Sequence, residues 1–170
     1  MNKSFKIVVT GPFGAGKSRF IKTISEIDVI STERRITHRE KGVKRETTVA
    51  MDYGRVTLNS DALHLYGTPG QVRFEFMWDI LSREMAGFVM LVDATAPDSF
   101  YHARELIDGF ITDTPVPYVV AANKQDMADA VALAKVRRGM DLGAEVLIMP
   151  CVATRKTSVK QVLLQLVDLL

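Results

Sequence analysis

The stretch of sequence that decides the fold is Gly11-Pro12-Phe13-Gly14-Ala15-Gly16-Lys17-Ser18. It fits the pattern GxxxxGK[ST] and stands where that pattern requires, between the apolar run Phe5–Val9 and a helical pattern beginning at Phe20. Glycines let successive backbone N–H groups converge on phosphate oxygens, and the helix N-terminus adds partial positive charge. We therefore predict a phosphate-binding loop in which Lys17 reaches the β- and γ-phosphates and the Ser18 hydroxyl coordinates Mg²⁺. The alternative, a glycine-rich turn with an incidental lysine, is disfavoured by the flanking strand and helix.

Further apolar runs rich in β-branched residues predict buried parallel strands at Phe88–Val92, Val116–Ala121 and Val146–Met149, because none alternates with polar residues. Helical patterns lie between these runs. Val49–Leu58 and Ala62–Tyr66 indicate a hairpin that adds an antiparallel edge. The sequence thus predicts an α/β fold, a three-layer α/β/α sandwich with a mostly parallel six-stranded sheet and one antiparallel edge strand. Ligands of such folds bind at the carboxyl ends of the strands.

Size and charge limit the organisation and the partners. The chain has 170 residues, 47% of them hydrophobic, which predicts a single domain over residues 1–170. Its net charge of +2 carries no bulk signal for nucleic acid, so we expect affinity for phosphate to be local and no nucleic-acid partner.

Features of the chain ends and of cysteine usage predict a cytoplasmic protein. Cys151, the single cysteine, has no internal partner for a disulfide, and the N-terminus resembles no signal peptide. No apolar run approaches the roughly 18 residues of a membrane span. Asn2 stands where myristoylation needs glycine, and no C-terminal prenylation cysteine is present, so we expect no direct membrane anchor.

A second motif, Asn123-Lys124-Gln125-Asp126, follows a predicted strand at its carboxyl end. A carboxylate there accepts from the two guanine donors, the ring N–H and the exocyclic amine, whereas adenine presents an acceptor at the corresponding ring position; Asp126 therefore predicts selection of guanine. Asn123 and Lys124 are expected to tie this loop to the phosphate loop and to pack along the base. The alternative is a helix N-cap with a solvated lysine. The loop Cys151–Thr154 is placed to offer the backbone N–H of Ala153 to the guanine carbonyl.

Together these motifs resemble the Ras-like small GTPases over essentially the whole chain, in family order and spacing. The stretch from Leu63 to Phe74, which contains Gly-Thr-Pro-Gly-Gln, is most similar to the prokaryotic branch that includes MglA and the nucleotide-binding members of bacterial conservon operons. Asn-Lys-Gln-Asp is the wording of Arf proteins. The resemblance implies a P-loop NTPase G domain that binds GTP or GDP with Mg²⁺ and hydrolyses GTP slowly. It also implies that the protein regulates a partner, with a roadblock-domain protein as regulator and an unidentified effector.

The polar stretch Ser31–Thr48 is too long for an idle connector. In Ras-like proteins a threonine of this loop reaches Mg²⁺ and the γ-phosphate, which orders the loop. The resemblance assigns this role to Thr48, with Thr47 as the second candidate; the alternative is that both are β-prone residues at a strand start. Arg45 and Arg73 are candidates for an arginine finger that acts on the γ-phosphate.

Gly67-Thr68-Pro69-Gly70-Gln71 corresponds to the family's DxxGQ, in which Gly70 would donate its N–H to the γ-phosphate and Gln71 would orient the attacking water. Gly67 occupies the position at which the family has an aspartate that faces Mg²⁺. MglA-like proteins also lack this aspartate. Asp52 is a candidate substitute for it. Phe13 stands where Ras has glycine, so an arginine finger supplied by a partner would clash with it. Slow hydrolysis, or acceleration by a different geometry, follows as a hypothesis.

A switch helix is expected after Gln71. Its apolar residues at helical spacing either all pack on the sheet or present an aromatic patch to a regulator or effector. They are Phe74, Met77, Trp78, Leu81 and Met85.

The predicted site combines three sets of residues. The catalytic residues are Gln71 and Lys17, and the Mg²⁺ ligands are Ser18 and Thr48. The nucleotide-binding residues are Gly11, Phe13, Gly14, Ala15, Gly16, Lys17, Ser18, Arg19, Thr48, Gly70, Asn123, Lys124, Asp126, Val152, Ala153 and Thr154. Two alternative functions remain: a GTP-binding scaffold that hardly hydrolyses, and a small P-loop kinase that uses ATP.

Overall fold

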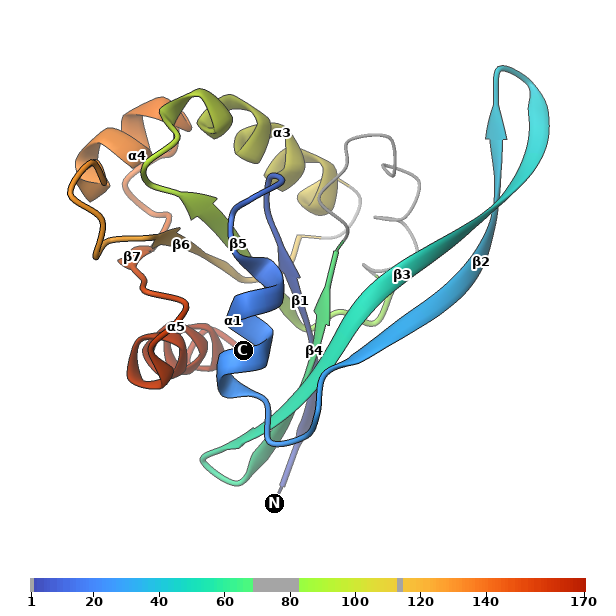
Figure 1. Cartoon of the computed structure of the whole chain (residues 1–170), viewed down its shortest axis with the longest axis horizontal. Helices are drawn as coiled ribbons and strands as arrows, with labels where there is room; N and C mark the ends of the chain where they lie inside the picture. The colour runs from blue at the N-terminus through green and yellow to red at the C-terminus, as the bar shows by residue number, and fades with distance from the viewer. Residues whose placement is uncertain (1, 69–82, 113–114) are drawn as a thin grey trace.

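A central sheet organises the computed structural model, which describes residues 2–68, 83–112 and 115–170 and, for 32–40 and 45–50, the backbone alone. Over these residues seven strands pair in the order β2-β3-β4-β1-β5-β6-β7 (Figure 1). The strands are β1 (Ser4–Thr10), β2 (Ile30–Glu40), β3 (Val43–Leu58), β4 (Asp61–Gly67), β5 (Gly87–Asp93), β6 (Tyr118–Asn123) and β7 (Ile148–Pro150). Strands β4, β1, β5, β6 and β7 are parallel, and β3 runs antiparallel to both of its neighbours.

Helices cover both faces of this sheet. Over the described residues these helices are α1 (Lys17–Ile24), the short 3-10 helix η2 (Pro97–Ser99), α3 (Phe100–Ile111), α4 (Leu133–Gly139) and α5 (Lys156–Val167). Phe88, Met90 and Val92 of β5 pack with α3 and α4 in one core, whereas Val89 and Leu91 pack with α1 and α5 in the other. Successive side chains of a strand point to opposite faces, so a continuous apolar run serves two cores. The predicted three-layer α/β fold is confirmed.

The strand count and the position of the antiparallel strand differ from the prediction. The sequence predicts six strands and a polar loop over 31–48; instead β2 occupies 30–40, and β3 begins at Val43. Lys41 and Gly42 join them with φ values of 51° and 78°, the two positive values that a tight hairpin turn favours. The antiparallel strand β3 is therefore internal, with β2 at the edge. Polar composition concealed these strands, because an edge hairpin needs no apolar run.

Figure 1 shows this hairpin extending beyond the body of the sheet, away from the helices. The phosphate-loop turn between β1 and α1, by contrast, lies at the carboxyl end of β1, and Gly11 approaches Leu91 near the end of β5. Among the helices that the structure describes, none has the length and apolar character to cross a membrane.

Candidate nucleotide-binding site

The phosphate loop connects β1 to the first turn of α1. Gly16 is the residue before the helix, with a φ of 102° and no side chain that caps the first turn. A Cβ at this position would lie 2.5 Å from Asn123 Nδ2, so only glycine allows this approach. The first N–H groups of a helix have no intrahelical acceptor, so those of α1 are available to an anion.

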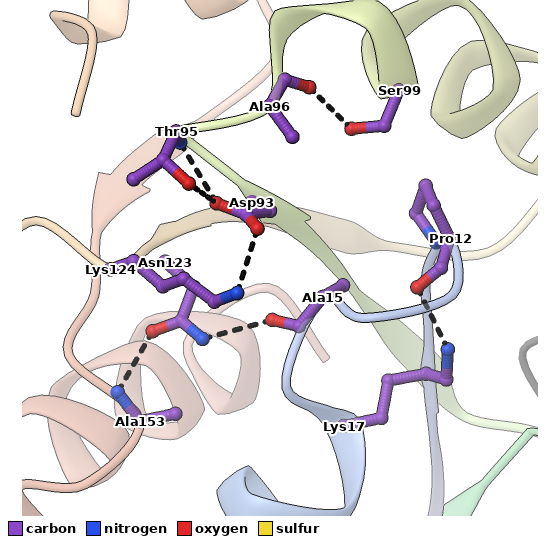
Figure 2. A network of polar contacts seen from close by, with 10 residues as sticks. All are labelled: Pro12, Ala15, Lys17, Asp93, Thr95, Ala96, Ser99, Asn123, Lys124 and Ala153. Carbon is purple, nitrogen blue, oxygen red and sulfur yellow. Dashed lines mark hydrogen bonds and ion pairs between the residues drawn. The ribbon is translucent and has the colours of Figure 1, made fainter. Parts of the chain in front are cut away.

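Lys17 lies beneath this loop and is 8% exposed. Its Nζ donates to the carbonyl oxygen of Gly11 at 2.6 Å. It also donates to that of Pro12 at 3.1 Å (Figure 2). Burial lowers the pKa of Lys17 to about 8, because water no longer solvates the ammonium. Within the described residues no carboxylate pairs with this charge. A phosphate group would supply the missing negative charge.

Ser18 lies next to Asp52 of β3, and its hydroxyl donates to Asp52 Oδ2 at 2.6 Å. Asp52 also pairs in register with Gly67 of β4, the position where the resembled family has its aspartate. A carboxylate is thus present beside the place of the missing one. Hydroxyl and carboxylate oxygens suit Mg²⁺, which binds through one or two protein oxygens plus phosphates and water. These two residues fit that ion, although the described residues contain no cluster of three or more His, Cys, Asp or Glu that would hold a metal by themselves.

Asn123, the last residue of β6, joins three loops. Its Nδ2 donates to the Ala15 carbonyl of the phosphate loop at 2.9 Å, and its Oδ1 accepts from the Ala153 N–H at 2.9 Å (Figure 2). It is 3% exposed. The Asn123 amide therefore fixes the phosphate loop, the loop after β6 and the loop after β7 relative to one another. Asn123 thus contacts the phosphate loop, whereas the Lys124 ammonium, which is expected to share this role, bonds to Asp93 instead.

The partner of Ala153 differs from the expectation. Its N–H is expected to serve the guanine carbonyl, but it donates to Asn123 instead. Within the described residues, the neighbouring N–H of Thr154 donates to no acceptor. Spacing along the chain identifies the loop, but the direction of one N–H depends on the local turn.

A cavity of about 230 Å³ opens between these loops. Its lining residues come from α1, the loop after β6 and the loop after β7, and eight of those described contribute: Arg19, Asn123, Lys124, Asp126, Met127, Val152, Ala153 and Thr154. Arg19 and Asp126 are exposed at its rim, and Lys124 is half-buried. Seven of the eight are predicted nucleotide-binding residues, and Met127 is the addition. The structure thus brings together the predicted base-binding residues and Arg19.

Two polar residues of the β5 end escaped the sequence analysis. Asp93 accepts from Lys124 Nζ at 2.7 Å, and Thr95 donates to the same carboxylate through its N–H at 2.8 Å and its hydroxyl at 2.6 Å. The signal that would have found Asp93 is a carboxylate at the carboxyl end of a buried strand.

Thr48 is the predicted site residue that the structure places elsewhere. It lies on β3, in register with Arg35 of β2 and four residues before Asp52. At about 3.3 Å per residue, its backbone lies roughly 13 Å along the strand from Asp52. Thr47 and Arg45 lie farther still along β3. Phe13, at the loop tip, is 83% exposed.

The predicted switch residues after Thr68 lie outside the described residues. They are Gly70, Gln71, Arg73, Phe74, Met77, Trp78 and Leu81. Met85, the last apolar residue of the expected helix, is buried in the core that contains α3 and α4.

Comparison with known proteins relates the chain to nucleotide-binding families. Residues 27–170 match a family model described as "Conserved hypothetical ATP binding protein", a match that begins after the phosphate loop. An uncharacterized protein of Methanocaldococcus jannaschii, MJ1339, is 31% identical over 124 residues, which are 73% of this chain and 72% of that protein.

Two further relatives carry Ras-like or Arf-like names. The Ras and EF-hand domain-containing protein homolog of Caenorhabditis elegans is 28% identical over 131 residues, 74% of this chain and 19% of that one. Human ADP-ribosylation factor-related protein 1 is 24% identical over 137 residues, 77% of this chain and 64% of that one. The chain therefore spans less than two thirds of both of these relatives.

Proposed function

The chain belongs to the family described as a conserved hypothetical ATP binding protein, and we propose that the nucleotide it binds is GTP or GDP. The chain is a P-loop nucleotide-binding protein with Ras-like and Arf-like relatives. One observation supports guanine as the base: Asp126 lies at the rim of the cavity. Asn123 connects the loops of this cavity to the phosphate loop.

Guanine, and not adenine, complements that carboxylate. Asp126 is exposed at the cavity and accepts hydrogen bonds only, because an ionised carboxylate has no proton to donate. Guanine offers two donors on one edge, whereas adenine would set a ring acceptor against the negative charge. A site built for such a hydrogen-bonded edge rejects the unmatched analogue by about 10⁴-fold.

The test is nucleotide preference in the wild-type chain and in Asp126→Asn. We expect GDP to bind about 10⁴-fold more tightly than ADP, and Asp126→Asn to reduce this ratio at least about a hundredfold. Asp129→Asn removes the same charge from an exposed residue outside the cavity and should leave the ratio unchanged. Equal affinity for guanosine and adenosine nucleotides, or an unaltered ratio in Asp126→Asn, would refute the proposal and favour an ATP-binding protein.

We further propose that the γ-phosphate of GTP changes the β2–β3 hairpin. Thr48 reaches the neighbourhood of Ser18 only if β3 shifts or bends, because the extended strand keeps the backbone of Thr48 far from Asp52, which Ser18 contacts. A bound Mg²⁺ ion would neutralise phosphate charge, with Ser18 as its ligand and Asp52 behind Ser18. Lys17 would turn from the loop carbonyls toward the phosphates. The hairpin would then report the triphosphate to a partner.

Hydrolysis is the enzymatic part of the proposal. Gln71 would orient water and Lys17 would stabilise the developing charge, which makes the chain a slow GTPase. Gly67 and the exposed Phe13 favour the second candidate, a GTP-binding scaffold that hardly hydrolyses. Single-turnover phosphate release distinguishes the two. Phe13→Gly should release phosphate faster in the presence of a partner. An unchanged rate with and without partner would show that Phe13 does not limit hydrolysis.

The cellular setting completes the proposal. We propose one G domain over residues 1–170, of the MglA-like prokaryotic branch, with a roadblock-domain regulator that recognises the switches. The cytoplasm is the proposed compartment, since the single cysteine, Cys151, is a buried free thiol.

A further inference from the structure

Asp93 is the last residue of β5 and lies beside the base cavity without lining it. Its side chain is 14% exposed and accepts hydrogen bonds on both oxygens. Figure 2 shows the arrangement: Oδ1 faces Thr95, and Oδ2 faces the Lys124 ammonium at 2.7 Å. The carboxylate thus connects the β5–η2 turn to a residue of the cavity wall.

The backbone places Asp93 before any contact with Lys124 is made. Parallel pairing sets Asp93 opposite Asn123, so the next residue of the β6 end, Lys124, leaves the sheet at the same edge. The N–H of Ala94 donates to the Asn123 carbonyl at 3.0 Å, which closes the two strand ends together. Thr95 then fixes the rotation of the carboxylate through two hydrogen bonds, as in an Asx turn. The Asp93 carboxylate is therefore held in a fixed orientation.

Charge favours the same arrangement. Burial raises the pKa of Asp93, but the hydrogen bonds from Lys124 and Thr95 outweigh it and bring that pKa below its ordinary value. The carboxylate is consequently ionised at neutral pH. It meets the ammonium in a partly buried setting, where an ion pair is screened less than on an open surface.

Lys124 needs an anchor for two reasons. Its backbone is left-handed, with a φ of 66°, which is uncommon for a residue with a side chain. Its side chain is also long and half-exposed, and a free lysine samples many rotamers. Because the ammonium is bound by Asp93, the aliphatic stem stays in one position along the cavity.

We propose that Asp93 is a positioning residue that pins the Lys124 ammonium, so that the lysine stem covers one face of the bound purine and slows nucleotide release. The inference rests on the proposed function only in that the cavity receives a purine base, and it applies equally to guanine and adenine. Asp93 itself touches no nucleotide, so its effect acts entirely through Lys124.

The experiment is a double-mutant cycle on dissociation of ribose-labelled GDP, with Asp93→Asn, Lys124→Ala and the double variant. Asp93→Asn should accelerate dissociation about tenfold at an unchanged association rate, since it removes one charge-assisted hydrogen bond. In the Lys124→Ala background the same change should have less than about a twofold effect. A general structural weakening would accelerate release equally in both backgrounds.

Controls keep the result specific. Asp98→Asn removes a carboxylate from the exposed η2 segment and should leave dissociation unchanged. If Asp93→Asn does not fold, Thr95→Ala replaces it; this variant keeps the charge but removes one support of the carboxylate, and should accelerate release about threefold.

The outcomes separate this inference from the proposed function. Dissociation from Asp93→Asn, or from its Thr95→Ala substitute, at the wild-type rate would overturn the inference alone, as would equal acceleration in both backgrounds. If the wild-type chain prefers ADP, the cycle is run with ribose-labelled ADP and the same coupling is expected. Failure of wild type to bind either nucleotide would overturn both proposals.

Discussion

Gly16 lies where the phosphate loop approaches the base loop. Its hydrogen faces the Asn123 amide, which in turn binds Ala15 and Ala153, so one small residue permits the bridge between phosphate loop and base loop. A substitution at Gly16 should therefore affect both the phosphate end and the base end of the candidate ligand site.

Gly16→Ala should break this bridge. The new Cβ would lie 2.5 Å from Asn123 Nδ2 at a φ of 102°, so the amide must move; we expect nucleotide affinity to fall about a hundredfold and stability to fall by about 1–2 kcal/mol. Gly14→Ala is the matched control, because it carries similar backbone strain at a φ of 80° with no atom within 4 Å of the new Cβ. Titration calorimetry and urea unfolding measure both effects. Equal losses of affinity in the two variants would contradict the role of the bridge.

Asp52 is a second residue whose role can be tested alone. Its carboxylate accepts from Ser18 and lies in register with Gly67. Asp52→Asn removes the charge but retains an acceptor, so we expect about tenfold more Mg²⁺ to be needed for half-maximal nucleotide retention, with little change in EDTA. Asp28→Asn, an exposed loop carboxylate, is the control. A Mg²⁺ requirement equal to that of wild type would exclude Asp52 from the metal environment.

At the scale of elements, the β2–β3 hairpin is the part most altered from the sequence-based expectation. Thr and Ile residues within a charged stretch are compatible with an edge strand, and the Lys41-Gly42 turn closes it. Because β3 is extended, the backbone of Thr48 lies away from Asp52, the residue that Ser18 contacts. If the hairpin is a switch, its effect must depend on the third phosphate.

Thr48→Ala should accordingly weaken GTP binding about tenfold and leave GDP binding unchanged, because only the triphosphate state would recruit the threonine to the metal. Competition of unlabelled GTP and GDP against a labelled nucleotide gives both constants. Thr47→Ala is the neighbouring control and should change neither. A loss in Thr47→Ala with none in Thr48→Ala would transfer the role to Thr47.

At the scale of the whole molecule, two cores hold the sheet between its helix layers. Phe88 is fully buried in the core that contains α3 and α4, where its ring stacks on Tyr118 at 4.9 Å and on Phe110 at 5.2 Å between centroids. It lies near the start of β5, and the nucleotide site lies beyond the end of that strand. Stability and binding should therefore respond differently to its loss.

Phe88→Ala should destabilise the fold by about 3–5 kcal/mol, through lost burial and the cavity left behind. Chemical denaturation reports this as a lower midpoint. In the folded fraction, GDP affinity should stay within about threefold of wild type, because Phe88 is not among the described residues that line the cavity. A larger loss of affinity would show that this core and the site are coupled.

Local patterns were enough to predict the α/β layering, the phosphate loop and the base loop. Each depends on residues close together in the chain: a continuous apolar strand, glycines before a lysine, or a carboxylate shortly after a strand end. The functional assignments of these residues, Asp126 above all, stay predictions for the experiments above.

Tertiary structure alone revealed the contacts among those parts. The Ser18–Asp52 hydrogen bond spans 34 residues and joins the first turn of α1 to β3, so it depends on how that helix packs on the sheet. The Asp93–Lys124 ion pair spans 31 residues and exists because the pairing of β5 with β6 brings the two strand ends together. The hydrogen bond from the Ala153 N–H to Asn123 and the additional strand β2 likewise became evident only from the tertiary structure. Register is a long-range property that depends on packing and turn geometry, so a single sequence read locally does not specify it.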